Sequence, residues 1–102
     1  TYLAGERVGN GRFHAPNDLV VGTDGTVFFT DPGHYPPATP PIGRVIAYAL
    51  DGTTRVVASD FWYCNGIALD RNGELVVVER TGLQRVFPDG SREWVVEHLG
   101  PR

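Results

Sequence analysis

A segment of this chain occurs twice. Residues 14–31 reappear, with substitutions, as residues 62–79, at a constant offset of 48 positions. In each copy an asparagine (Asn17 or Asn65) precedes an apolar run, a polar turn with glycine follows, and a second apolar run completes the unit. Periods of about 40–50 residues are typical of proteins built from repeated supersecondary units. The repeat therefore predicts two neighbouring units with one asparagine at the same place in each.

The apolar runs predict β-strands. They are short, rich in valine, phenylalanine and tyrosine, and interrupted by many of the 13 glycines and 8 prolines. Asp-Gly or Asn-Gly pairs at 24–25, 51–52, 72–73 and 89–90 predict hairpin turns, and no apolar stripe at helical spacing is convincing over ten or more residues. We expect strands near residues 1–4, 18–22, 26–31, 43–49, 53–59, 66–70, 74–79, 83–87 and 91–97.

Two of these runs, residues 27–29 and 75–78, are apolar on both faces. A strand buried on both faces belongs to a sheet that lies between two others. Four-stranded antiparallel sheets packed around an axis provide that environment in a β-propeller. The predicted fold class is therefore all-β, a β-propeller fragment of about two four-stranded antiparallel blades. We expect residues 1–12 to end a preceding blade, 13–60 to form the first blade and 61–102 to form the second.

Two blades do not close a propeller ring, which needs about four to eight. We therefore expect this chain to be a piece of a longer protein or to assemble as a homo-oligomer, with a closed trimer as the testable case. The proline-rich segment 33–42 interrupts the repeat, and its composition predicts a surface loop.

Composition excludes some classes of partner. The net charge is −3, and the nine basic residues, all arginine, form no cluster, so we expect no nucleic-acid partner. No apolar stretch approaches the length of about 18–20 residues that a membrane span needs. The one cysteine, Cys64, rules out an internal disulfide. We expect a cytoplasmic protein, with a periplasmic or secreted location left open.

Three motifs together carry a resemblance to a known family. They are His-Ala-Pro-Asn-Asp at 14–18, Phe-Thr-Asp-Pro-Gly at 29–33 and Cys-Asn-Gly-Ile-Ala-Leu-Asp at 64–70. In these motifs the chain resembles the SMP-30/gluconolactonase/luciferin-regenerating family, over nearly its whole length but only the middle third of the family's length. The resemblance implies a six-bladed β-propeller that hydrolyses lactones, or phosphotriesters in related members, with a divalent metal on the central axis.

The resemblance also implies roles for the two asparagines. Asn65 would be a metal ligand through its side-chain oxygen, and Asn17 would contact the metal or the substrate. The implied cofactor is Ca²⁺, which takes neutral amide oxygens together with carboxylates, with Zn²⁺ or Mn²⁺ as alternatives. The family completes its site with a glutamate, expected before Thr1, and with an aspartate, the proposed acid/base residue, expected beyond Arg102. This chain would then supply no catalytic residue of its own.

Other residues are weaker candidates, and each has a structural alternative. Both asparagines could simply cap turns, Asp31 could anchor the Pro-Gly turn after it, and His14 has only its closeness to Asn17 in its favour. We expect Cys64 to be a buried small residue and no nucleophile, since it has no evident basic partner. His34 and Tyr35 could belong to a solvated loop, and Trp62 and Tyr63 could pack between blades. The predicted substrate-binding set is Asn17, Asp18, His34, Tyr35, Trp62 and Tyr63.

These expectations define the functional hypotheses. In the first, the chain is part of a metal-dependent lactonase-type hydrolase that acts on a sugar lactone or similar ester. It would be active as an ester hydrolase if other blades or copies complete it. The alternative is a non-catalytic oligomeric blade module or small-molecule binder that lacks the catalytic acids. A strictosidine-synthase-like propeller shares the fold and stays a third hypothesis.

Overall fold

The computed structural model describes residues 7–8, 11–13, 15–33, 40–79 and 82–97. These residues form β-strands joined by turns. They include no helix, and therefore no helix long and apolar enough to cross a membrane. The strands are β1 (Arg7–Val8), β2 (Gly11–Arg12), β3 (Leu19–Val21), β4 (Val27–Asp31), β5 (Gly43–Tyr48), β6 (Thr54–Phe61), β7 (Cys64–Leu69), β8 (Leu75–Glu79), β9 (Gly82–Val86) and β10 (Arg92–Val96).

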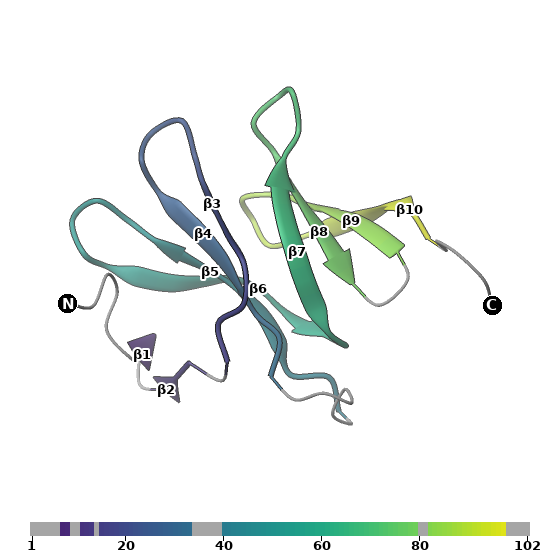
Figure 1. The fold of residues 1–102 in the computed structure, drawn as a ribbon, viewed down its shortest axis with the longest axis horizontal. Coiled ribbons are helices and arrows are strands. Elements are labelled where there is room, and N and C mark those ends of the chain that lie inside the picture. The colour runs from purple at the N-terminus through teal and green to yellow at the C-terminus, as the bar shows by residue number, and fades with distance from the viewer. Residues whose placement is uncertain (1–6, 9–10, 14, 34–39, 80–81, 98–102) are drawn as a thin grey trace.

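The main strands form two four-stranded antiparallel sheets of the same topology. The first has the order β3-β4-β5-β6 and the second the order β7-β8-β9-β10, so each is a meander in which consecutive strands pair (Figure 1). Strands β1 and β2 pair separately as a short antiparallel ribbon. The described fold is all-β and matches two blades of a β-propeller, which confirms the predicted fold class.

The hairpin turns lie where the sequence predicts them. Gly25 and Gly73 occupy equivalent places in the two sheets, with φ of 89° and 81°. A residue with a side chain rarely adopts this backbone conformation, so glycine is the residue that closes such a tight turn. The same Asp-Gly or Asn-Gly chemistry therefore sets the register of β3 with β4 and of β7 with β8.

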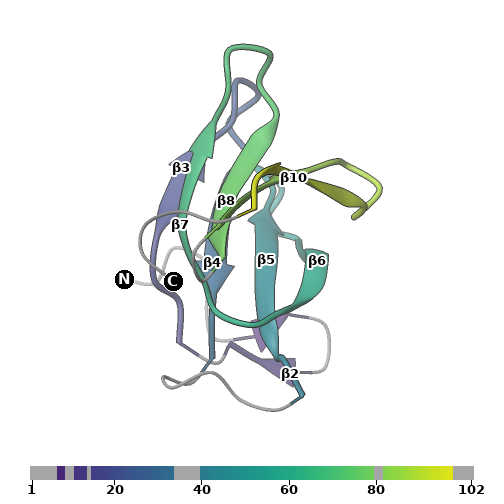
Figure 2. The ribbon, with the colours of Figure 1, turned by 90° about the vertical axis from the view of Figure 1, so that its right-hand side faces the viewer.

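The first strands of the two sheets lie side by side. Strand β7 contacts both β3 and β4, and Figure 1 shows the two sheets diverging from this line towards their outer strands. Viewed from the side, β3 and β7 again run next to each other (Figure 2). The segments that lead into β3 and β7 therefore lie at one end of the molecule.

An apolar core fills the space between the sheets. Alternating residues of each strand point into it, because successive side chains of a strand face opposite sides. Val45, Ala47 and Val57 come from the first sheet, and Leu75, Val77 and Val86 from the second; all are at most 7% exposed. Burial of such side chains contributes about 25 cal/mol per Å² of apolar surface, so this interface is the main link between the sheets.

Arg92 adds a polar link at the outer edge. Its side chain lies on β10 and reaches across to the end of β6, where it donates to the carbonyl oxygens of Ser59 at 3.0 Å and Asp60 at 3.2 Å. The guanidinium also lies 4.0 Å from the centre of the Phe61 ring. One arginine therefore joins the outermost strands of both sheets.

The other face of the first sheet holds a smaller apolar cluster. Phe29 and Ile46 form its buried part, with Phe13, Val27 and Tyr48 packed against them. The rings of Phe13 and Phe29 meet edge to face with centroids 5.2 Å apart, a favourable geometry for aromatic pairs. Strand β4 thus has apolar contacts on both faces, as the run 27–29 predicts.

Most strand predictions agree with the structure to within one or two residues. The main differences are at β6, which continues to Phe61 through Asp60 at φ 65°, and at β7, which begins at Cys64. Aspartate tolerates the left-handed region better than most residues, so β6 bends there without ending. The ribbon of β1 and β2 was not predicted, because two-residue strands carry no periodicity. The predicted strand 1–4 lies outside the described residues, as does most of the predicted loop.

Candidate functional site

Asn17 and Asn65 lie at the entry to the first strand of each sheet. Both are exposed. The Asn17 backbone N–H donates to the main-chain oxygen of Thr30 at 3.0 Å. The Thr30 hydroxyl donates to the main-chain oxygen of Asn65 at 2.7 Å. One buried residue of β4 therefore contacts both asparagine segments through their backbones. Within the described residues neither side-chain amide has a hydrogen-bond partner, which leaves both amide oxygens accessible to a ligand.

Gly66, which follows Asn65, allows the backbone to pass close to the Val78 side chain. A Cβ atom on Gly66 would lie 3.2 Å from Cγ2 of Val78 and 4.0 Å from Oδ2 of Asp18. The register of β7 with β8 also shifts between Cys64 and Ile67, which marks a bulge around Asn65. Bulges re-aim side chains at the ends of strands, and this one turns Asn65 out of the regular pairing.

Asp18 joins the two sheets through its carboxylate. Oδ1 accepts from the Leu19 N–H at 2.9 Å, and Oδ2 accepts from the Ile67 N–H at 3.2 Å. The Asp18 N–H also donates to the Thr30 hydroxyl at 3.1 Å. The carboxylate therefore connects the start of β3 with the bulge of β7. Its predicted contact with substrate stays a prediction, and a structural role is now visible beside it.

Two buried carboxylates hold the segments that lead to the asparagines. Asp31 is fully buried; it accepts from the Ala15 N–H and forms an ion pair with Arg44 at 2.5 Å. Glu79 is 3% exposed and accepts from the Trp62 N–H at 2.7 Å. Each carboxylate ends the second strand of its sheet, so the same device operates in both repeats. For Asp31, these contacts are with the Ala15 backbone and Arg44, and the expected anchoring of the Pro-Gly turn after it stays a prediction.

Sequence reasoning did not identify Glu79 or Thr30. The signal for Glu79 was present, because the repeat aligns it with Asp31. No local signal marks Thr30, since its equivalent in the second repeat is Val78 and its partner Asn65 is 35 residues away. Only the approach of β7 to β4 gives its hydroxyl a partner.

Cys64 behaves as the sequence predicts. It is fully buried, and its Sγ donates to the Arg44 carbonyl oxygen at 3.3 Å. Burial raises the pKa of the thiol from 9.0 to about 12, and the nearby Glu79 and Asp31 charges add to the rise. The thiol is therefore protonated at neutral pH and is not a nucleophile there.

The aromatic candidates are only partly placed. Trp62 is 36% exposed and Tyr63 is half-buried, and both come directly before the second asparagine segment. His14, His34 and Tyr35 lie outside the described residues. The substrate contacts of Trp62, Tyr63, His34 and Tyr35 stay predictions.

The donors at this end fit part of a calcium site. Two exposed amide oxygens are suitable neutral ligands, but a calcium site also needs carboxylate oxygens. The described carboxylates nearby, Asp18, Asp31 and Glu79, already accept hydrogen bonds from the backbone. Among the described residues, no three His, Cys, Asp or Glu side chains gather as a metal-binding group. A complete site would need carboxylates from elsewhere.

Comparisons with known proteins find similar folds among solved structures. No family model matches the chain, and no curated protein does. Among solved structures, the fold is similar to an X-ray structure described as a candidate gluconolactonase, with a TM-score of 0.69 and 24% sequence identity. The match covers 89% of this chain and 36% of that chain, so this chain spans about a third of its length. At this identity the likeness shows a common fold.

Proposed function

We propose that this chain is part of a metal-dependent lactonase-type hydrolase, similar to the SMP-30 and gluconolactonase proteins, that opens a sugar lactone or similar ester. The observation that carries the proposal is the pair of exposed asparagines at one end of adjacent strands, tied through Thr30. The fold likeness to a candidate gluconolactonase supports it. The motifs at 14–18, 29–33 and 64–70, two of which contain these asparagines, also support it.

In this proposal each residue has a limited role. Asn65 offers its side-chain oxygen to a divalent cation, Ca²⁺ first and Zn²⁺ or Mn²⁺ as alternatives, and Asn17 holds the cation or the substrate. When bound, such a cation polarises an ester carbonyl and lowers the pKa of a bound water. Asp18 and Thr30 keep the two asparagine segments in register. The remaining carboxylate ligands and the general base come from the rest of a longer chain or from other copies of this one.

Calorimetric titration with Ca²⁺ tests the assignment. We expect Asn65→Ala to abolish binding and Asn17→Ala to weaken it or to weaken lactone binding instead. Asn72→Ala is the matched control, because Asn72 is an exposed asparagine in the β7–β8 turn. The titration is made on the assembled protein, that is, the oligomer or the full-length chain. Equal Ca²⁺ affinity in all three variants would remove the metal-ligand assignment of Asn65.

The second candidate function is a non-catalytic blade module or small-molecule binder. It is favoured by the engagement of Asp18, Asp31 and Glu79 in backbone contacts, which gives each of these three carboxylates a structural role. A lactonase assay with added Ca²⁺, Mn²⁺ or Zn²⁺ separates the candidates, and light scattering gives the oligomeric state. Metal-dependent turnover by the 102-residue chain would exclude the non-catalytic function.

A further inference from the structure

A small apolar cavity lies between the two sheets, away from the asparagines. Its volume is about 130 Å³. Phe28 and Val57 of the first sheet line one side, and Leu75, Val86 and Phe87 of the second line the other. Phe28 and Leu75 lie near the starts of β4 and β8, whereas the asparagine segments contact Thr30 and Glu79 near the ends of these strands. The cavity is therefore separate from the candidate site described above.

The size and lining of the cavity suit one small ring. Val57, Leu75 and Val86 are at most 7% exposed, so the walls belong to the rigid core between the sheets. An apolar cavity of about 150 Å³ in another protein stays free of water and binds benzene. Binding of an apolar ring in a cavity of similar volume with aliphatic and aromatic walls is favourable, because it removes the apolar surface of the ring from water.

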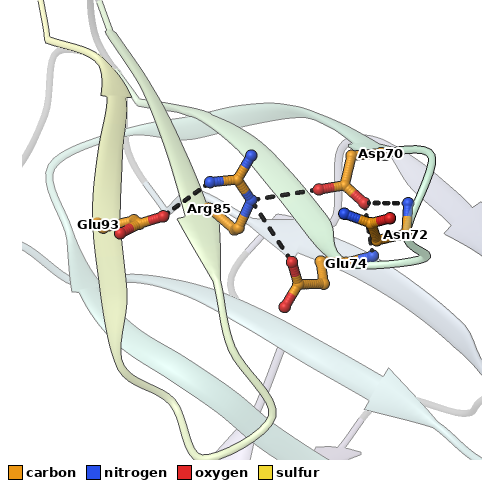
Figure 3. A network of polar contacts seen from close by, with 5 residues as sticks. All are labelled: Asp70, Asn72, Glu74, Arg85 and Glu93. Atoms are coloured by element: carbon orange, nitrogen blue, oxygen red, sulfur yellow. Dashed lines mark hydrogen bonds and ion pairs between the residues drawn. The ribbon is translucent and has the colours of Figure 1, made fainter.

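The charges at the rim point to an anionic group on that ring. Arg55 lines the cavity together with Val57, and it pairs across the sheet with Ala47 of the core between the sheets. Within the described residues its guanidinium forms no ion pair. Glu74 lies on the opposite wall, but its carboxylate is 3.7 Å from Nε of Arg85 (Figure 3). Arg55 is therefore the positive charge at the rim that can pair with an anionic group of a ligand.

We propose that this cavity is a binding site for a small aromatic carboxylate. The ring lies between the sheets against Phe28, Val57 and Leu75, and the carboxylate pairs with the Arg55 guanidinium. Guanidinium and carboxylate groups fit each other through two parallel hydrogen bonds. The proposal is independent of the hydrolase assignment, since neither asparagine takes part.

Titration of the ¹⁵N-labelled chain with benzoate, followed by NMR, tests the site. We expect saturable shifts of the amide signals of Val57, Leu75 and Val86 at millimolar benzoate. Benzyl alcohol and benzylamine are the probes matched in size, and both should bind more weakly at the same ionic strength. Absence of saturable shifts with benzoate, or tighter binding of benzylamine, would overturn the proposal, the second result assigning the rim charge to Glu74.

Variants at the rim separate the charge from the apolar walls. Arg55→Gln should weaken benzoate binding about two- to fivefold, the change expected for loss of an exposed ion pair. Arg55→Glu should weaken it further and reverse the preference towards benzylamine. Arg71→Gln, at an exposed arginine in the β7–β8 turn that does not line the cavity, should leave the affinity unchanged. Amide signal dispersion shows that each variant is folded. Unchanged benzoate affinity in Arg55→Gln would contradict the role of Arg55.

Discussion

The hydroxyl of Thr30 forms hydrogen bonds with both sheets. It is fully buried, donates to the Asn65 main-chain oxygen at 2.7 Å and accepts from the Asp18 N–H at 3.1 Å. Valine has nearly the same shape but cannot make either bond. A buried polar group that loses its partner costs more than a hydrogen bond gains on average. The hydroxyl is thus a specific requirement of the junction between β3, β4 and β7.

The variant Thr30→Val measures this requirement. We expect it to lower the free energy of unfolding by about 1–3 kcal/mol, because two backbone groups near the junction lose a partner. Urea denaturation provides the measurement. Thr23→Val, in the exposed β3–β4 turn, is the control and should change the stability by less than about 0.5 kcal/mol. A similar loss in both variants would show that the Thr30 hydroxyl has no special role.

The Cys64 thiol gives a prediction about pH. Its folded pKa of about 12 lies above the usual 9.0 because burial disfavours the thiolate. The thiol therefore stabilises the fold fully below about pH 9, and this contribution is lost as the pH rises from 9 towards 12. At pH 8 a thiol-specific reagent should react about a thousandfold more slowly with the folded chain than with the urea-unfolded chain. Rapid reaction of the folded chain at pH 8 would contradict the buried, protonated state.

At the scale of elements, the two meanders repeat the same local rules with different side chains. Each has a positive-φ glycine in its first turn and a buried carboxylate at the end of its second strand, Asp31 in one and Glu79 in the other. The longer glutamate reaches the Trp62 N–H, whereas the aspartate reaches the Ala15 N–H. The function of the position is therefore preserved although the residue differs.

The second sheet has a charge cluster that the described residues of the first sheet do not repeat. Arg85 on β9 contacts Asp70 at 3.2 Å, Glu74 at 3.7 Å and Glu93 at 2.7 Å (Figure 3). The hydrogen bonds to Glu93 and Asp70 raise the pKa of Arg85. The pKa of Asp70 is lowered, first by the Glu74 N–H and then by further backbone and Arg85 contacts. One cation thus holds three carboxylates from β7–β8 and β10 against β9.

The effect of removing the Arg85 charge on thermal stability should depend on the salt concentration. We expect Arg85→Gln to lower the midpoint of thermal unfolding at low salt, because three neighbouring carboxylates then repel one another without compensation. At about 1 M NaCl the Debye length is about 3 Å, so the difference from the unmodified chain should shrink. Arg71→Gln, at an exposed arginine outside the cluster, is the control. A difference that does not depend on salt would assign the effect to lost packing of the arginine stem.

At the scale of the whole molecule, the two sheets are joined by contacts in the core and at both edges. The apolar core between them provides most of the link, and Arg92 adds contacts with Ser59, Asp60 and Phe61 at the outer edge. The inner edge is linked by Asp18 and Thr30. The core is thus bordered on both sides by side chains that cross from one sheet to the other.

The variant Arg92→Met tests the outer link. It keeps an apolar stem but removes two hydrogen bonds and the cation–π contact, so we expect a loss of about 1–3 kcal/mol in the free energy of unfolding. Arg92→Lys keeps the charge without the planar guanidinium and should lose less stability.

Denaturation followed by fluorescence and by circular dichroism should give coincident curves for the unmodified chain. If the unmodified chain unfolds in two steps, the sheets are not one cooperative unit.

Much of the fold could be predicted because its determinants are local. Asp-Gly and Asn-Gly turns, apolar runs and the 48-residue repeat predict the eight main strands and their grouping into two sheets. Of the candidate site, the positions of Asn17 and Asn65 at the entry to equivalent strands follow from the same repeat. The ribbon of β1 and β2 could not be predicted, since its strands are too short for periodicity.

The sequence by itself determined the elements, because turn residues and alternation act over a few neighbouring positions. The tertiary structure alone decided which buried polar groups meet across the sheets. The bond from Thr30 to Asn65, the bridge from Asp18 to Ile67 and the reach of Arg92 to Ser59 each join residues more than 30 positions apart. Such pairs exist only once the apolar core has brought the two sheets together, so nothing local in the chain records them.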